Sequence, residues 1–306
     1  MNSVLLINGL IGGIVFGGIY ALIGASLNVL VGVLRIINFA HGEFILAGGF
    51  LTYAVLTYFG LSPLITLPFA AVIFFVAGYG LYYLLIPRLA KSDEPETASF
   101  LMMFGVSLVI VSVLTWIFEA DVRPINFSFD PINVVLATIK DGYGEGRDAK
   151  VLIPTARLVA LAINIVIILA MTWFLYRTLV GKAMRAAIMN REAVQIVGIN
   201  IHRLSASAFG LAAALAATTG VLLTLVVPSV DPNGGADLTL IGFIVIVLGG
   251  LGHPVGALAA GVIFGVVEQL SNVLMPQAAA QMLSFIILIL VIFIKPSGLF
   301  GLERGR

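Results

Sequence analysis

The chain has 306 residues, of which 60% are hydrophobic and only 10% charged, and its formal net charge is +1. An ordinary soluble domain carries roughly 25% charged residues. A soluble fold of this composition would leave a large apolar surface in water, so the composition excludes a soluble globular protein. The chain contains no cysteine, which excludes a disulfide framework and any cysteine-based metal or redox site.

Apolar segments long enough to cross a bilayer follow one another along the chain. A membrane-spanning helix needs about 20 mostly apolar residues. Such segments lie near Val4–Leu34, Phe39–Tyr58, Pro63–Ile86, Phe100–Phe118, Pro154–Leu175, Leu204–Val227 and Met282–Ile294. They lack the strict period-two alternation of a β-barrel strand. The sequence therefore predicts an all-α polytopic membrane protein with about eight transmembrane helices, in a single transmembrane domain at residues 1–306.

The region at residues 238–270 is apolar throughout but interrupted in the middle. The string GGLGHP at residues 249–254 separates two apolar halves of about 11 and 15 residues, and each half is short for a complete span. Glycine and proline in this position indicate a discontinuous or re-entrant helix, which is tolerated where protein or water lines it.

The positive charges predict the orientation of the chain. Placing Arg35, the loop at 88–96, the loop at 177–203 and the C-terminal tail on one side collects 11 of the 16 lysines and arginines. By the positive-inside rule this side is cytoplasmic, so we expect the N-terminus outside and the C-terminus in the cytoplasm. Residues 119–153 then form an external loop. Its six acidic residues, together with Asp231 and Asp237 on the same side, either form part of a docking surface or simply keep the outer face solvated.

Residues 178–203 form a cytoplasmic loop in this topology. The part from Gly181 to Arg203 reads GKAMRAAIMNREAVQIVGINIHR. It is rich in helix formers and contains no proline, and Gly198 is able to end a helix in the left-handed conformation. A short basic helix between two spans either presents residues to a soluble partner or merely sets the topology, and composition alone does not separate these interpretations.

Three strings carry a family resemblance. The string GKAMRAAIMNREAVQIVGIN at 181–200 resembles the coupling loop of the LivH-type permeases, the branched-chain amino acid family of ABC importers. INFAHGEFILAGGF at 37–50 and PSGLFG at 296–301 resemble two further markers of this family. The resemblance implies a multi-pass protein of the bacterial inner membrane that pairs with a second, related permease. It also implies two cytoplasmic ATPase subunits and a periplasmic substrate-binding protein as partners, besides the lipid bilayer, and no nucleic acid.

The resemblance further implies how the chain takes part in transport. Gly181, Arg185, Asn190 and Gly198 would belong to the helix that docks on an ATPase. The chain has no G-x-x-x-x-G-K-[ST] string, so nucleotide must bind to another subunit. We therefore expect no enzyme activity and no cofactor in this chain, with ATP and magnesium on the partner subunits.

The resemblance leaves the substrate open. The family suggests branched-chain or other hydrophobic amino acids, while an importer of urea or a short amide would share the architecture. A stand-alone secondary transporter is the alternative from another class. Such carriers usually bury several ionisable residues for coupling, and the predicted spans of this chain contain few.

A few polar residues fall inside the predicted spans. A charged side chain near the bilayer centre costs about 2.5–3.5 kcal/mol on insertion scales, so these residues are candidates for a substrate pathway. Glu43 either has this role or is an interfacial carboxylate that pairs with Arg35 or caps the helix after Asn38. His41 is more typical of a hydrogen-bonded packing residue than of a proton relay. Our pathway candidates are Asn38, His41, Glu43, Gly250 and His253.

Overall fold

The structure is a computed structural model that describes residues 3–89, 94–139, 149–295 and 298–300. The helices of this part of the chain are α1 (Ser3–Leu34), α2 (His41–Phe59), α3 (Pro63–Leu89), α4 (Pro95–Phe118), α5 (Thr155–Arg177), α6 (Leu179–Met189), α7 (Arg191–Ile196), α8 (Ile201–Val226), α9 (Gly235–Gly249), α10 (Pro254–Leu274) and α11 (Gln277–Ile294). The strands are β1 (Arg123–Pro124), β2 (Asn133–Ile139), β3 (Ala149–Pro154) and β4 (Ser229–Val230).

The fold confirms the prediction of a polytopic helical membrane protein. Within the described residues, seven helices are long and apolar enough to cross a membrane, namely α1, α2, α3, α4, α5, α8 and α10. Two shorter apolar helices lie at Gly235–Gly249 and Phe285–Ile294. The chain is thus a multi-pass membrane protein.

The region at 238–270 is interrupted where the sequence predicts it. Helix α9 has 15 residues and ends at Gly249, and α10 begins at Pro254. The prediction that both halves are short is wrong for the second half, because α10 continues to Leu274 and has 21 residues. Only α9 is therefore too short to span a bilayer alone.

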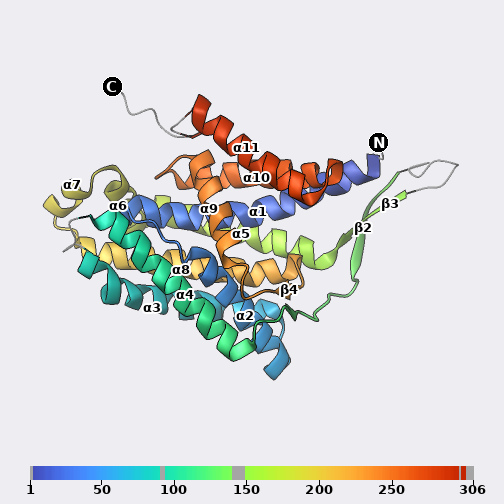
Figure 1. The fold of residues 1–306 in the computed structure, drawn as a ribbon, viewed down its shortest axis with the longest axis horizontal. Helices are drawn as coiled ribbons and strands as arrows, with labels where there is room; N and C mark the ends of the chain where they lie inside the picture. Colours follow the sequence, from blue (N-terminus) through green and yellow to red (C-terminus); the bar gives the residue numbers. More distant parts are fainter. Residues whose placement is uncertain (1–2, 90–93, 140–148, 296–297, 301–306) are drawn as a thin grey trace.

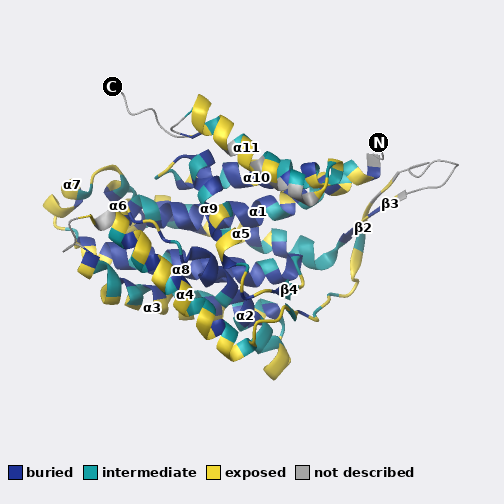
Figure 2. Ribbon diagram, in the orientation of Figure 1, coloured by how far each residue is buried: buried dark blue, intermediate teal, exposed yellow. Residues whose placement is uncertain are grey.

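Helices α1 and α8 form the interior of the bundle. In the most apolar stretch of each helix, 83% of the α1 residues and 89% of the α8 residues are buried, against 17% in α3 and α4. Figure 2 shows the buried residues concentrated along α1 and α8, with exposed residues on α3, α4 and α11. The outer helices therefore present apolar side chains to their surroundings, as lipid or another membrane subunit requires.

Glycines allow α1 and α10 to approach each other closely. A Cβ atom added to Gly13 would lie 2.6 Å from the Cα of Val266, and one added to Gly17 would lie 2.8 Å from the Cα of Val262. On the other helix, a Cβ atom on Gly265 would collide with the backbone of Gly17. The small-xxx-small spacing of Gly9, Gly13 and Gly17 is typical of such membrane helix contacts.

The segment at 119–153 is more ordered than the predicted loop. Strands β2 and β3 form an antiparallel hairpin in which Val134 lies opposite Ile153, and β1 pairs with β4. Val151 packs against Val4 at the start of α1. The sequence interpretation missed the hairpin because acidic, glycine and proline residues obscure two short apolar runs that satisfy each other's backbone groups.

The end of the bundle opposite the β2–β3 hairpin holds the segments that the positive charges place on one side of the membrane. Arg191 Nη1 lies 3.5 Å from the carbonyl oxygen of Leu34, at the end of α1. Near the C-terminus, the Leu299 amide donates to the Leu248 carbonyl at 2.7 Å. We call this region, with α6, α7, Arg35 and the turn at 250–253, the α6 end (Figure 1). Lys91, Arg304 and Arg306 lie outside the described residues, and the side of the membrane that this end faces stays a prediction.

The close contact of α1 with α10 predicts the effect of one substitution. We expect Gly17→Leu to lower the stability of the purified protein by about 1–3 kcal/mol, because the added side chain would overlap the α10 backbone. Thermal unfolding in detergent measures this change. Gly80→Leu is the matched control, since Gly80 is exposed on α3 and nothing lies within 4 Å of an added Cβ atom. Equal melting temperatures for the two variants would contradict the packing argument.

Candidate functional site

The corner between α5 and α6 is tightly built. The Thr178 hydroxyl accepts a hydrogen bond from the Gly181 amide at 3.0 Å and so caps the first turn of α6. A Cβ atom added to Gly181 would lie 2.6 Å from the Cα of Leu175 and would collide with the Phe174 carbonyl. Gly181 is therefore the residue that permits this close approach of α6 to the end of α5.

Arg185 holds α6 against α5. Its Nε donates to the carbonyl oxygen of Leu175 at 3.0 Å. Its guanidinium carbon lies 4.1 Å from the centroid of the Tyr176 ring, a cation–π geometry. The side chain thus turns back onto α5 and fixes the position of α6.

Asn190 and Gly198 shape the rest of the segment. The Asn190 side-chain oxygen accepts a hydrogen bond from the Ala193 amide at 3.0 Å, which caps α7. Gly198 follows α7 with φ +82°, a left-handed conformation that favours glycine. All four predicted coupling residues lie in one continuous segment at the α6 end, and each fixes its shape. Their role in docking an ATPase stays a prediction.

The same segment exposes large apolar side chains that the sequence interpretation did not single out. Met189 is 84% exposed, Ile196 is 85% exposed and Val197 is 72% exposed. They lie among polar residues such as Asn190 and Glu192, beyond the apolar spans. Exposed apolar groups in such a setting typically mark an interaction surface. The local sequence held no clear signal for their exposure, because the packing of the segment decides that Met184 and Val194 are buried while the other three face outward.

Buried polar residues surround the start of α2. Asn38 accepts a hydrogen bond from the Ala40 amide at 3.0 Å and shapes the turn that leads into the helix. His41 is fully buried, and its Nε2 lies 3.0 Å from the Ser26 hydroxyl of α1. The expectation of a hydrogen-bonded packing histidine therefore agrees with its surroundings.

Glu43 is buried between α2, α4 and α9. One carboxylate oxygen accepts a hydrogen bond from the Ser107 hydroxyl at 2.8 Å, and only 2% of the residue is exposed. The carboxylate also lies against Gly235 at the beginning of α9, where the helix dipole favours negative charge. Pairing with Arg35 is wrong, because Arg35 is exposed at the α6 end and forms no ion pair with any described residue.

The second set of pathway candidates lies at the other end of α9. The side-chain amide of Asn28 donates a hydrogen bond to the Gly250 carbonyl at 2.9 Å. His253 Nδ1 accepts one from the backbone amide of Gly256 at 2.8 Å. His253 thus caps α10. Helix α9 separates the two sets of candidates, with Glu43 beside its beginning at Gly235 and Gly250 directly after its end. Their part in a pathway stays a prediction.

A metal centre has no support in the described part of the chain. No group of three or more His, Asp or Glu side chains that could hold a metal ion occurs among these residues.

The architecture defines the class of protein. Polar and ionisable side chains inside a bundle of apolar spans typically mark a substrate or ion path. Residues 9–292 match the family described as "Branched-chain amino acid transport system / permease component". The chain belongs to this family of permeases, which confirms the resemblance.

Individual relatives agree with this assignment. The chain is 27% identical over 298 residues to the high-affinity branched-chain amino acid permease LivH of Salmonella typhimurium, covering 94% of this chain and 93% of LivH. It is 25% identical over 301 residues to the permease BraD of Pseudomonas aeruginosa, covering 95% and 94%. A ribose import permease, RbsC of Haemophilus influenzae, is 26% identical over 193 residues, covering 61% and 56%. No solved structure matches the chain.

The surroundings of Glu43 lead to a test of its role. Glu43→Gln keeps the shape and an acceptor for Ser107 but removes the charge, so we expect a stability loss of about 1 kcal/mol or less. If the carboxylate serves transport, uptake by the reconstituted complex falls severalfold. Ser107→Ala is the control, because it removes the hydrogen bond to Glu43 and keeps the charge. Normal uptake by Glu43→Gln would leave Glu43 with a structural role alone.

The contacts of Arg185 predict a loss of coupling. Arg185→Glu removes the hydrogen bond to Leu175 and the contact with Tyr176, together worth roughly 2 kcal/mol, so α6 is released from α5. We expect the protein to insert normally while stimulation of ATP hydrolysis by substrate-loaded binding protein is lost. Lys182→Glu makes the same charge change at an exposed position of α6 and is expected to have a smaller effect. Wild-type stimulation in Arg185→Glu would contradict this role.

Proposed function

We propose that this chain is the transmembrane permease subunit of an ATP-driven importer for branched-chain or other hydrophobic amino acids in the bacterial inner membrane. Its membership of the permease family supports this function. So do the branched-chain amino acid permeases that align with it over nearly their whole length. The ribose permease covers little more than half of either chain, and sugar transport has correspondingly less support.

The observation that carries the proposal is the exposed apolar group on α6 and α7. Met189, Ile196 and Val197 project from a segment that Gly181 and Arg185 hold rigidly against α5. A rigid element is able to transmit a displacement from a bound subunit to the spans. The α6 end would then face the cytoplasm, where two ATPase subunits dock and carry ATP and magnesium.

The remaining partners occupy other surfaces in this proposal. A second, related permease subunit completes the translocation pathway, and lipid covers the rest of the apolar outer helices. The end that holds the β2–β3 hairpin faces the periplasm and receives the substrate-binding protein. The N-terminus is then outside and the C-terminus cytoplasmic.

Reconstitution tests this function directly. The complete complex, with its partner permease, ATPase subunits and binding protein, is placed in liposomes, and uptake of labelled leucine, urea and acetamide is compared. We expect ATP-dependent leucine uptake that requires the binding protein. Uptake of urea or acetamide in place of leucine would assign the complex to amide import. Uptake by this chain alone, driven by an ion gradient, would show a secondary transporter.

The exposed position of Ile196 leads to a test of docking. Ile196→Glu would place a charge in the interface with an ATPase subunit, so we expect the loss of at least about 2 kcal/mol of binding free energy, the threshold of an interface hot spot. This corresponds to about 30-fold weaker association. Ile196→Leu keeps the apolar contact and is the control. The affinity of the purified permease pair for the ATPase is the measurement, and unchanged affinity in Ile196→Glu would remove this surface from the interface.

A further inference from the structure

The β2–β3 hairpin is apolar on both of its faces. On one face Val151 and Ile153 are buried, and Val151 packs against Val4 of α1. On the other face Val135 and Leu152 lie opposite each other and are 50% and 48% exposed. An antiparallel sheet with one solvated face normally alternates apolar and polar residues, whereas strands that are apolar on both faces are normally buried on both. The outer face of the hairpin therefore lacks its cover in the single chain.

The hairpin lies beyond the ends of the membrane spans. Helix α1 has 32 residues and is about 48 Å long, which exceeds the hydrocarbon core of about 30 Å. The hairpin packs on the first turns of α1, at Val4 and Ile7, and β3 runs directly into α5 at Thr155. Figure 1 shows β2 and β3 at the end of the bundle that holds the N-terminus. Because the lipid tails end before this position, a polypeptide fits the apolar outer face better than lipid does.

A cavity continues this apolar surface at the base of the hairpin. It has a volume of about 220 Å³ and lies between the segment 127–132, the start of α5 and the end of α8. Ile132, which directly precedes β2 and is 64% exposed, forms part of its wall, together with Phe127, Phe129, Leu225 and Val226. The cavity is smaller than the roughly 300–1,000 Å³ of small-molecule sites. It suits a single apolar side chain of a partner, the kind of buried anchor that dominates protein interfaces.

Arg157 gives this cavity a positive charge. Among the described residues that line the cavity, Arg157 alone is charged, and it forms no ion pair within the described part of the chain. It belongs to the first turn of α5, where the helix dipole disfavours a positive charge. Asp130, in the same outer segment, is exposed and does not line the cavity. The guanidinium group is therefore complementary to a carboxylate of another molecule.

We propose that the outer face of the β2–β3 hairpin and the Arg157 cavity form the surface on which the second permease subunit packs. An apolar side chain of that subunit occupies the cavity, and a neighbouring carboxylate binds Arg157. Permanent interfaces are more hydrophobic than transient ones, which favours a resident subunit over a binding protein that docks and leaves. A membrane subunit beside α5 and α8 also reaches both the cavity at their ends and the hairpin beyond them. The presence of a second permease rests on the proposed function.

Photo-cross-linking identifies what covers the hairpin. The photoreactive amino acid p-benzoylphenylalanine is incorporated in place of Leu152, and the complete complex is irradiated in liposomes of phosphatidylethanolamine and phosphatidylglycerol. We expect this position to attach to the second permease subunit both with and without the binding protein. Met189, which is exposed on α6, is replaced in the same way as the control and is expected to attach to an ATPase subunit.

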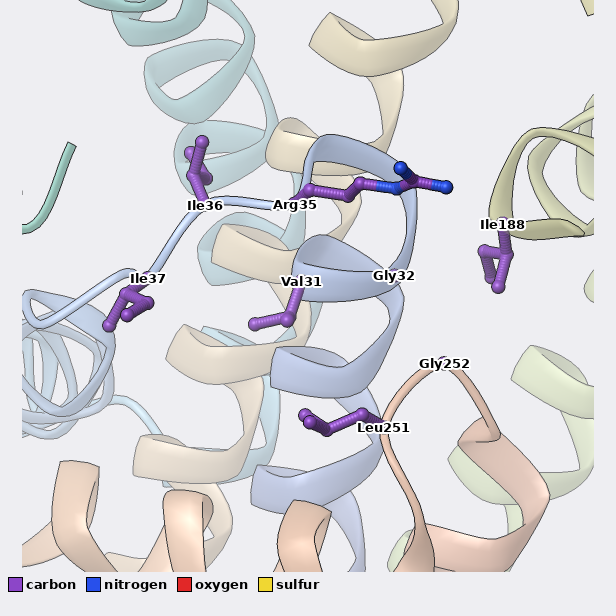
Figure 3. Close-up of a pocket in the computed structure, with 8 residues that line it drawn as sticks. All are labelled: Val31, Gly32, Arg35, Ile36, Ile37, Ile188, Leu251 and Gly252. Atoms are coloured by element: carbon purple, nitrogen blue, oxygen red, sulfur yellow. The ribbon is translucent and has the colours of Figure 1, made fainter. Parts of the chain in front are cut away.

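Charge reversal tests the cavity. We expect Arg157→Glu to weaken the association of the two permease subunits at least about tenfold, a difference of about 1.4 kcal/mol, and Arg157→Lys to keep most of it. Retention of the second permease on the tagged chain in detergent is the measurement. The matched control is Arg35→Glu, because Arg35 also forms no described ion pair but extends toward Ile188 in a cavity at the α6 end (Figure 3). If Arg157→Glu lowers the amount of chain in the membrane, Arg157→Gln takes its place.

Specific outcomes overturn the surface. Attachment of position 152 to the binding protein alone would assign it to docking of that protein, and attachment to lipid alone, or to nothing, would show that no permease covers it. Equal retention of the second permease by the wild type and the Arg157 variants would remove the cavity from the interface. All of these results leave the proposed function standing if the complex imports leucine. Conversely, attachment to the second permease in a complex that fails to import leucine supports the surface and overturns only the proposed substrate.

Discussion

Close backbone contact between helices is the constraint on which the rest of this structure depends. Lipid tails are as apolar as leucine, so membrane helices associate through van der Waals packing and not through the hydrophobic effect. Gly17 and Gly265 bring the backbones of α1 and α10 together, and Gly48 and Gly220 do the same for α2 and α8. These contacts allow α1 and α8 to be buried in the middle of a bundle whose outer helices remain apolar.

The short helix α9 packs against the buried helix α1. Within an apolar interior, the backbone groups at the ends of such a helix need polar partners. At its end, the Gly250 carbonyl accepts a hydrogen bond from the Asn28 side-chain amide at 2.9 Å. Near its beginning, the Thr239 hydroxyl accepts one from the Gly42 amide at 2.8 Å, which satisfies a backbone group in the first turn of α2. Of the pathway candidates, Gly250 thus lies at the end of an interrupted helix, where the Asn28 side chain satisfies its carbonyl group.

The segment at 178–203 shows how far residue identity predicts a site. Its helical character and the use of Gly198 as a helix end follow from local chemistry, and both agree with the structure. The direction of each side chain does not follow from local chemistry. Arg185 turns back to the Leu175 carbonyl, whereas Ile196 is exposed, because the angle between α5 and α6 decides which face of the segment is covered.

The sequence by itself determined the class of fold, most of the spans and the interruption before Pro254. This is possible because membrane insertion depends on the hydropathy of consecutive residues. The family also followed from short strings in the chain. Only the tertiary structure decided that Glu43 lies against Ser107 and not Arg35, and that Arg35 and Glu192 line the same cavity. These neighbouring residues lie far apart in the sequence, and the crossing of packed helices brings them together, which no local pattern records.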